Sequence, residues 1–327
     1  MIRSLLLAGI ALASAAPAIA QHDLELPAQP PVLPPPPMAA QEGSDWVIYP
    51  VRDNVFMLSG PSGNVAVQIG RDGVAVVDTG EAGEARDLVT QIRRLSDKPI
   101  RYIFNTGSDA AHTGGNTTVA AGGVDLVGGS EGSGLLGNGG GAPILAHEQV
   151  MFHLLEAEID EGLPTLTYFV EQKDVHFNGG PISLIHAPGH NSGNSLAMFR
   201  RADVVAAGDV YAPDRYPFID IDRGGSITDY LTSLNHLIAI TVPEFNQQGG
   251  TLVIPGHGRL SDEGDIGEYR DMVTFIRDRV KAMMDRGMSL DDITAARPTF
   301  DYDPLFGADA GDVFVGQIYR SLSQEGE

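Results

Sequence analysis

Residues 105–116 read NTGSDAAHTGGN and follow directly on the apolar, β-type run IRYIF at 100–104. This polar segment contains two side chains that can bind a metal ion, Asp109 and His112, together with three glycines. Glycines allow a close approach between the backbone and a ligand. The stretch therefore predicts a strand that ends in a loop carrying candidate functional residues.

Three further segments show the same pattern, in which an apolar run is followed by a glycine and by a side chain that can bind a metal ion. They are HAPGHNSGNS at 186–195 with His190, AAGDVY at 206–211 with Asp209, and VIPGHGR at 253–259 with His257. Functional sites in α/β proteins collect at the ends of strands, so we expect these loops to point at one place. The chain contains no cysteine, which leaves imidazole and carboxylate as the good metal ligands.

The rest of the chain predicts strands alternating with helices, which is typical of an α/β protein. Expected strands are 46–51, 55–60, 64–70, 73–80, 100–104, 123–129, several short ones within 165–187, and then 195–200, 203–208 and 251–255. Expected helices are 85–95, a short one within 112–123, 147–159, 226–240 and 265–286.

The order of these motifs resembles the metallo-β-lactamase fold of hydrolases. The motifs are VVDTG at 76–80, T-x-x-D-x-x-H-T-G-G-N at 106–116, PGH-x-x-G-x-S at 188–195, AGD at 207–209 and PGHG at 255–258. The resemblance covers roughly residues 46–287. It implies a four-layer αββα sandwich, one or two metal ions at one edge of the sheets, and hydrolysis of esters, thioesters, lactams or phosphodiesters.

The chain departs from this family at its first motif. Where family members carry H-x-H-x-D-H, the aligned residues are Gly107, Asp109, Ala111 and His112. The resemblance then implies that the first metal site retains Asp109, His190 and Asp209, and that the second retains His112, Asp209 and His257. The chain looks closest to divergent branches in which both motif histidines are replaced.

Several roles remain open for these residues. Two imidazoles and one carboxylate, from His112, Asp209 and His257, match the three protein ligands of a catalytic zinc site. Asp109 and His190 are then expected to complete the shell or to transfer protons, although Asp109 alone would also suit a helix cap. One zinc ion is expected, with iron or manganese as alternatives.

Other residues near the motifs have weaker signals. Asp78 in VVDTG resembles the family's buried strand-end aspartate, which orients the metal-binding loops by hydrogen bonds. Tyr211 and Tyr216 are candidates for substrate contact. His147 and His186 are interpreted as packed or surface histidines rather than cleft residues.

Three functions are compatible with these patterns. The leading hypothesis is an exported metal-dependent hydrolase that acts on an ester, lactone, lactam or similar bond of a small molecule. The alternatives are a catalytically impaired or non-catalytic member that binds a small molecule, and a mononuclear iron oxygenase, because two histidines and one carboxylate also suit Fe(II). The sequence predicts no oligomeric state.

Composition and the N-terminus indicate where the protein works. The 327 residues carry a formal net charge of −22, which disfavours nucleic acids and anionic membranes as partners. Residues 1–20 read as a signal peptide that ends in A-x-A, so a periplasmic or secreted protein without a membrane anchor is expected. Residues 21–44 are predicted to be a Pro-rich linker, and 45–327 a single domain with a C-terminal helical extension.

Overall fold

The computed structural model describes residues 36–124, 141–241 and 250–325. The predicted signal peptide, most of the predicted linker and most of the strand predicted at 123–129 lie outside these ranges. No helix within the described ranges is both long enough and apolar enough to span a bilayer.

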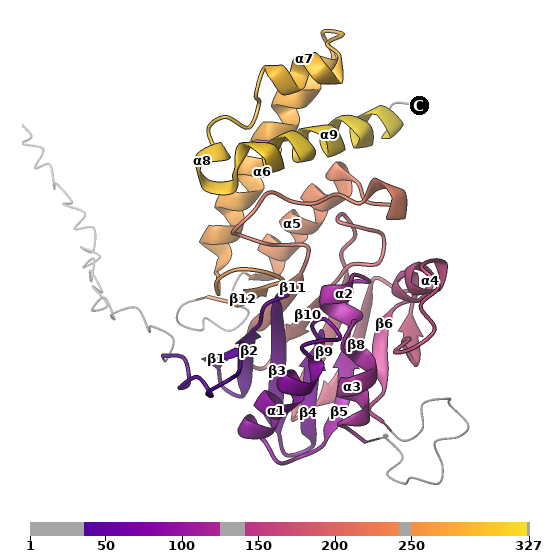
Figure 1. Cartoon of the computed structure of the whole chain (residues 1–327), viewed down its shortest axis with the longest axis vertical. Helices are drawn as coiled ribbons and strands as arrows, with labels where there is room; N and C mark the ends of the chain where they lie inside the picture. Colours follow the sequence, from indigo (N-terminus) through magenta and orange to yellow (C-terminus); the bar gives the residue numbers. More distant parts are fainter. Residues whose placement is uncertain (1–35, 125–140, 242–249, 326–327) are drawn as a thin grey trace, which may run out of the picture. The chain divides into compact units, whose positions relative to one another are not determined.

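The described chain alternates strands and helices, labelled in Figure 1. The strands are β1 (Val47–Arg52), β2 (Val55–Ser59), β3 (Asn64–Gly70), β4 (Gly73–Val77), β5 (Ile100–Phe104), β6 (Ile144–His147), β7 (Leu166–Tyr168), β8 (Gln172–Phe177), β9 (Gly180–His186), β10 (Ser195–Phe199), β11 (Val204–Gly208) and β12 (Leu252–Pro255). The helices are α1 (Ala85–Leu95), α2 (Ala110–Thr113), α3 (Asn116–Ala121), α4 (Glu148–Glu156), the 3₁₀ helix η2 (Ile221–Arg223), α5 (Ile227–Thr241), α6 (Glu263–Met284), α7 (Leu290–Ala295), α8 (Asp303–Phe306) and α9 (Ala308–Glu325).

The strands form two sheets. The first has seven strands in the order β1 to β7, and the second has five in the order β12-β11-β10-β9-β8. In the first sheet β1 to β4 are antiparallel neighbours, whereas β4 to β7 run parallel. In the second sheet β11 and β12 are parallel and the remaining pairs are antiparallel. The ends of parallel strands lie at the same edge, which matters for the site described below.

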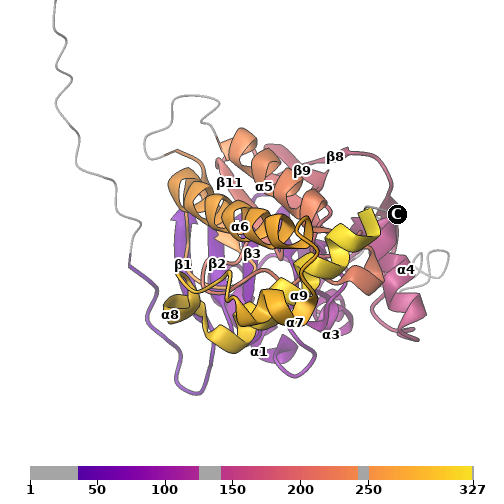
Figure 2. The same cartoon turned by 90° about the horizontal axis from the view of Figure 1, so that it is seen from above.

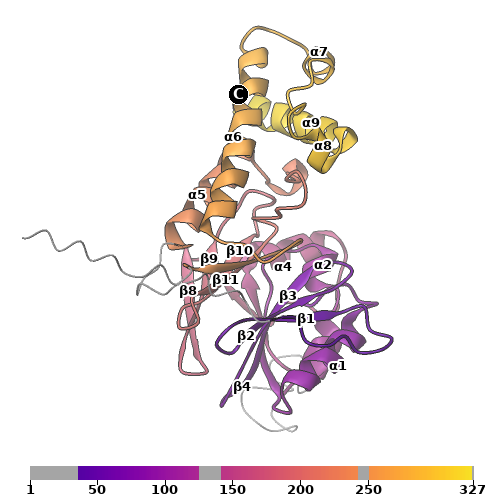
Figure 3. The same ribbon diagram turned by 90° about the vertical axis from the view of Figure 1, so that its left-hand side faces the viewer.

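Three apolar clusters define four layers. Met57, Ala75 and Phe104 of the first sheet pack against Leu184 and Phe199 of the second, between the sheets. The outer face of the first sheet is covered by α1 and α3, and that of the second by α5, α6 and α9. Figure 3 shows α1 on one side of the strands and α5 and α6 on the other. The predicted αββα sandwich is confirmed.

Glycines explain where one predicted helix divides. The helix expected within 112–123 is split into α2 and α3 by Gly114 and Gly115. A Cβ at Gly115 would collide with the carbonyl oxygen of Thr79, so the chain must pass there without a side chain. The contact brings the end of the α2 segment against the loop that follows β4.

Helices continue beyond the region of the resemblance. The predicted helix at 265–286 is α6, which starts at Glu263 because Asp262 and Asp265 form a capping box. Gly287 follows it with φ of +76°. The helices α7, α8 and α9 come next, and Figure 2 shows them beside α6. Phe314, Val315 and Ile318 of α9 belong to the same cluster as α6 and the second sheet.

Candidate metal centre

Every predicted site residue follows a strand. Asp109 and His112 come after β5 of the first sheet, whereas His190, Asp209 and His257 come after β9, β11 and β12 of the second. The loop of His257 is tied to the first sheet, because the Asn64 side-chain amide donates to the carbonyls of Pro255 and Gly258 at 3.0 and 2.9 Å. The loops of both sheets therefore meet at one edge of the sandwich.

The carboxylate of Asp209 lies at the centre of this meeting point. The Nε2 atoms of His112, His190 and His257 lie 2.7, 3.7 and 3.8 Å from its oxygens. His112 and His190 are buried, whereas the side chain of His257 is 20% exposed. Three imidazoles from three loops thus converge on a single carboxylate, as the motif order predicted.

Asp78 fixes the ring of His112, as expected from its position in VVDTG. The Nδ1 atom of His112 lies 2.9 Å from Asp78 Oδ2, and Thr106 donates to both carboxylate oxygens of Asp78 through its backbone N–H and its hydroxyl. Asp78 is 3% exposed and has φ of +66°, a conformation that is strained for a non-glycine residue. This arrangement directs the Nε2 atom of His112 toward Asp209.

A backbone carbonyl performs the same task for His190. Its Nδ1 donates to the carbonyl of Phe218 at 2.7 Å, so its Nε2 faces the centre, 2.8 Å from Asp109 Oδ2. Such a partner on the far ring nitrogen is typical of histidines that bind metal, because it sets the tautomer and the ring orientation.

Asp109 points into the centre and does not cap a helix. It occupies the N-cap position of α2, but its side chain makes no capping hydrogen bond. The interpretation of Asp109 as a helix cap is therefore wrong. Instead, Oδ2 faces His190, and Oδ1 accepts a 3.0 Å hydrogen bond from the Arg223 guanidinium. The carboxylate is held from two sides.

The geometry favours one set of three ligands among the described residues. Ligand atoms of Asp109, His190 and Asp209 all lie within 4.8 Å of one another. The sequence grouped His112 and His257 with Asp209. Both imidazoles face the Asp209 carboxylate, but the three residues do not bring their ligand atoms this close to one another. One imidazole and two carboxylates with restrained orientations suit a divalent ion such as zinc or manganese, so these residues fit a single metal ion.

The position of the family's first histidine is filled by another side chain. A Cβ on Gly107 would lie 3.1 Å from Asn194 Nδ2 and 3.3 Å from His112 Cδ2, which is tight packing. Asn194 is fully buried, and its Nδ2 has no hydrogen-bond partner among the described residues. Since Ala111 offers no ligand atom either, the residues do not fit a complete two-ion set.

Burial and neighbouring charge shift the pKa values of this cluster in opposite directions. Burial opposes the charged form of His190, but the carboxylates of Asp209 and Asp109 outweigh it and raise its pKa to about 9. Burial is likewise outweighed at His112, whose pKa Asp209 and Asp78 raise well above its usual value. His257 differs, because its burial prevails over Asp209 and lowers its pKa. Without metal, the carboxylates favour the protonated forms of His112 and His190, whereas burial favours the neutral form of His257.

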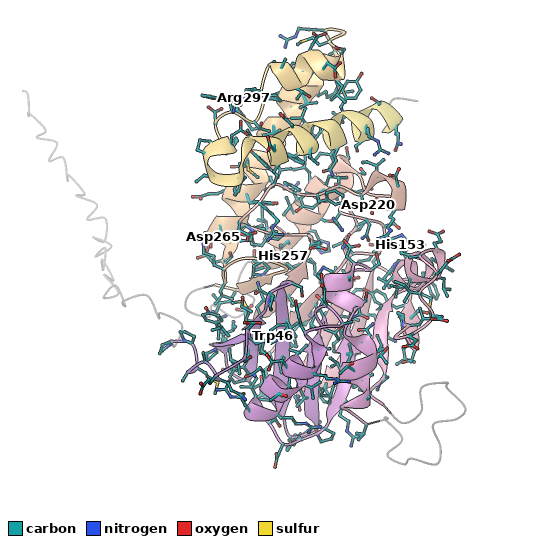
Figure 4. The ribbon with its side chains drawn as sticks, in the orientation of Figure 1. Trp46, His153, Asp220, His257, Asp265 and Arg297 are labelled. Atoms are coloured by element: carbon teal, nitrogen blue, oxygen red, sulfur yellow. The ribbon has the colours of Figure 1, made fainter. Side chains whose placement is uncertain are left out.

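Two residues of this region carried no sequence signal that we recognised. Arg223 lies in η2 and reaches Asp109 across 114 residues of sequence. His153 of α4, labelled in Figure 4, lies between the hydroxyls of Ser108 and Ser192 at 3.1 Å from each. Neither residue belongs to a recognisable motif, because their positions depend on how α4 and η2 pack against the loops.

Four other residues that lie near the motifs in the sequence pack against neighbouring side chains. Tyr211 and Tyr216 are buried and donate hydrogen bonds to Ser261 Oγ and Asp303 Oδ1, so both side chains pack in the interior rather than standing exposed for a substrate. The rings of His147 and His186 are stacked, with centroids 3.9 Å apart. The interpretation of these two histidines as packed residues is confirmed.

Two cavities reach this region from different sides. One, of about 600 Å³, is lined by His257 and by residues of β1, β2 and the loop after β2. The other, of about 590 Å³, is lined by Asp109, Arg223, His153 and residues of α2, α3 and α4. Both volumes are typical of pockets for small molecules.

Comparison with known proteins defines the class. The family model described as the metallo-beta-lactamase superfamily matches residues 59–257, and the chain belongs to that superfamily. Membership supports a hydrolase-type function. No curated protein sequence matches the chain significantly.

Solved structures share the fold at low sequence identity. The sec-alkylsulfatase Pisa1 from Pseudomonas sp. is 15% identical with a TM-score of 0.64, and the match covers 84% of this chain and 49% of that one. The metallo-beta-lactamase from Pontibacter korlensis is 13% identical with a TM-score of 0.52, covering 73% and 99%. The DIM-1 metallo-beta-lactamase is 15% identical with a TM-score of 0.54, covering 70% and 97%. The chain thus spans about half the length of the alkylsulfatase, and these similarities describe the fold alone.

Proposed function

We propose that the protein is an exported hydrolase of small molecules that depends on one divalent metal ion, held by Asp109, His190 and Asp209. The observation that carries the proposal is the convergence of these three ligand atoms within 4.8 Å. The hydrogen bond from His190 Nδ1 to the Phe218 carbonyl adds support, because it turns Nε2 toward the two carboxylates.

Each residue would have a separate task in this centre. A divalent ion held there would supply a Lewis acid that lowers the pKa of water and polarises the bond to be broken. Arg223 holds Asp109 so that Oδ2 stays directed at His190. His112, fixed by Asp78, orients Asp209 from the opposite side, and His257 lines the adjoining cavity.

The geometry of the centre supports the two alternative functions less well. The iron oxygenase hypothesis needed two histidines and one carboxylate, but the group that assembles has one histidine and two carboxylates. The hypothesis of a non-catalytic binding protein rests on Gly107 and Ala111, which stand where the family motif has two metal ligands. It leaves unexplained why the imidazole rings keep partners on the nitrogens that face away from the centre.

Metal analysis tests the proposal. The protein purified from zinc-supplemented cells should contain about one zinc ion per chain, measured by elemental analysis, and should hydrolyse members of an ester and lactone panel. Asp209→Asn should lose the metal and the activity. Asp214→Asn is the matched control, because this carboxylate also lines the His257 cavity but pairs with Arg215 outside the centre. A metal-free wild-type protein, or equal metal content in both variants, would refute the proposal.

Export has its own test. The proposal that residues 1–20 are a signal peptide expects mature protein to begin at or near Gln21, which N-terminal sequencing can determine. Protein recovered from the periplasm or the medium with Met1 intact would contradict it.

A further inference from the structure

Residues 216–220, called here the bridging segment, lie between the candidate metal centre and the C-terminal helices. The segment holds the ligand His190 through two backbone groups. The carbonyl of Phe218 accepts a hydrogen bond from His190 Nδ1 at 2.7 Å, and the N–H of Asp220 donates to the carbonyl of His190 at 2.8 Å. The bridging segment therefore restrains both the ring and the backbone of this ligand.

The bridging segment must itself be held by neighbouring elements. It forms neither helix nor strand, so it has no ladder of backbone hydrogen bonds of its own. The N–H of Ile219 donates instead to Oε1 of Gln317 on α9, at 3.0 Å. Ile219 is 1% exposed and Gln317 is 8% exposed, so this hydrogen bond is shielded from water. Without the Gln317 side chain, the Ile219 N–H would be buried and unsatisfied.

Tyr216 attaches the bridging segment to the C-terminal helices at a second point. Its ring stacks on that of Phe314 in α9 and meets that of Phe306 in α8 edge-on, with centroids 5.7 and 5.1 Å away. Its hydroxyl donates to Asp303 Oδ1 at 3.0 Å. The two attachments lie on either side of Phe218 in the chain, so they fix the place of its carbonyl.

This support comes from outside the region that defines the superfamily. The family model ends at residue 257, whereas α8 begins at Asp303 and α9 ends at Glu325. Figure 1 shows both helices beside α6, in the yellow part of the ribbon. Partners on the far nitrogen of a ligating histidine typically change metal affinity about 10- to 100-fold when they are removed. Helices that follow the family region thus hold a partner of this kind in place.

From these contacts we infer that α8 and α9 position the metal ligand His190 through the bridging segment, and that Gln317 and Tyr216 are positioning residues of the centre. The inference rests on the proposed function, because it concerns the support of the same centre. The effect of Gln317 passes through two hydrogen bonds, one with the Ile219 N–H and one between the adjoining Phe218 carbonyl and His190. A displaced bridging segment would turn Nε2 of His190 away from the two carboxylates.

The zinc affinity of three variants tests the inference. Gln317→Met keeps the length of the side chain but removes the acceptor, so zinc affinity should fall about tenfold. Gln317→Glu keeps an acceptor oxygen in either protonation state and should retain most of the affinity. Tyr216→Phe keeps the buried ring and removes only the hydroxyl, so it should lower the affinity less than Gln317→Met does. Competition with a chromophoric chelator measures all three.

Thr165→Val is the matched control. Oγ1 of Thr165 also accepts a backbone N–H at 3.0 Å, that of Ile144 at the start of β6, but this bond lies in the first sheet and not at the bridging segment. The variant should unfold at a lower urea concentration and bind zinc as the wild type does. Wild-type zinc affinity in both Gln317→Met and Tyr216→Phe, or an equal loss in Gln317→Met and Thr165→Val, would overturn the inference.

A measurement on metal-free protein separates this inference from the proposed function. The Nδ1 proton of His190, which the Phe218 carbonyl holds, should exchange with water faster in Gln317→Met than in the wild type or in Thr165→Val, as NMR can record. If the wild type takes up no zinc but this exchange accelerates, the metal-dependent hydrolase is refuted and the inference stands. If the wild type binds zinc but neither exchange nor affinity responds to Gln317→Met and Tyr216→Phe, the centre stands and the inference is wrong.

Discussion

Three substitutions set this centre apart from the motif of its superfamily, and two of them, Asp109 and Gly107, act on the surroundings of Asp209. Asp109 stands where the resemblance places an imidazole and adds a second carboxylate, which Arg223 partly offsets. Gly107 stands where another imidazole is expected, and Asn194 takes up the space. The first change keeps a ligand at its position, whereas the second removes one, and Ala111 removes another, so the remaining set suits one ion rather than two.

Competition between a proton and the zinc ion for His190 gives the first prediction. A zinc ligand must be deprotonated, but the carboxylates raise the pKa of His190 to about 9. Below that pH, loading the centre requires His190 to release a proton, so zinc affinity should increase about tenfold per pH unit between pH 6.5 and 8.5. Competition with a chromophoric chelator measures the affinity, and calorimetry in buffers of different ionisation enthalpy measures the proton release. An affinity independent of pH would show that His190 is not a ligand.

Stability of the metal-free protein should change with pH in the opposite sense. The unfolded chain releases this proton near its ordinary pKa, about 6.5, whereas the folded chain holds it up to about 9. The stabilisation is therefore complete below the lower value and is lost as pH rises through the higher one. Urea denaturation at pH 6.5 and pH 9.5 provides the check.

Packing at Gly107 gives a second residue-scale prediction. Gly107→Ala would press a methyl group against Asn194 and His112 in a buried space, so it should lower the free energy of unfolding by about 1–3 kcal/mol. Gly83→Ala is the control, because a Cβ there meets nothing within 4 Å. Urea denaturation of both variants measures the difference, and equal stabilities would mean that Asn194 does not fill the position.

At the scale of elements, the sequence predicted most of what positions the centre. Alternating β-branched residues and glycine-terminated runs are local signals, so the strands and the ligand-bearing loops could be read directly. The strand β6 was not predicted, because its four residues gain their structure from parallel neighbours on both sides. Arg223 and Asn194 were missed for a similar reason. Their roles arise from contacts between loops, which no local pattern encodes.

The glycine of the PGH motif shows how closely those loops must approach the helices. Gly189 has φ of +151°, and a Cβ there would collide with the backbone of Tyr230 in α5. Gly189→Ala should therefore lower the free energy of unfolding by about 3 kcal/mol and displace His190. Gly267→Ala in α6, where a Cβ meets nothing within 4 Å, should instead raise it by about 1 kcal/mol. Thermal melts of the two variants should differ in sign, and a tolerated Gly189→Ala would contradict the close packing.

On the scale of the whole molecule, the centre joins the two sheets. Asp109 follows β5 of the first sheet, whereas His190 and Asp209 follow β9 and β11 of the second. The ligands thus come from chain segments that are brought together only by the complete sandwich. A metal ion bound there favours the folded state over the unfolded one, because the ligand set does not exist in the unfolded chain.

Chelation should consequently destabilise the entire described domain. An ion present at a thousand times its dissociation constant contributes about 4 kcal/mol, which corresponds to a fall in Tm of about 7 °C on removal for a domain of this size. Asp209→Asn should melt at a temperature that chelator does not change, because the carboxylate that all three imidazoles face is gone. Calorimetry with and without chelator compares the two proteins. If the chelator lowers both melting temperatures equally, the metal acts elsewhere, and if it lowers neither, the two sheets are held together by packing alone.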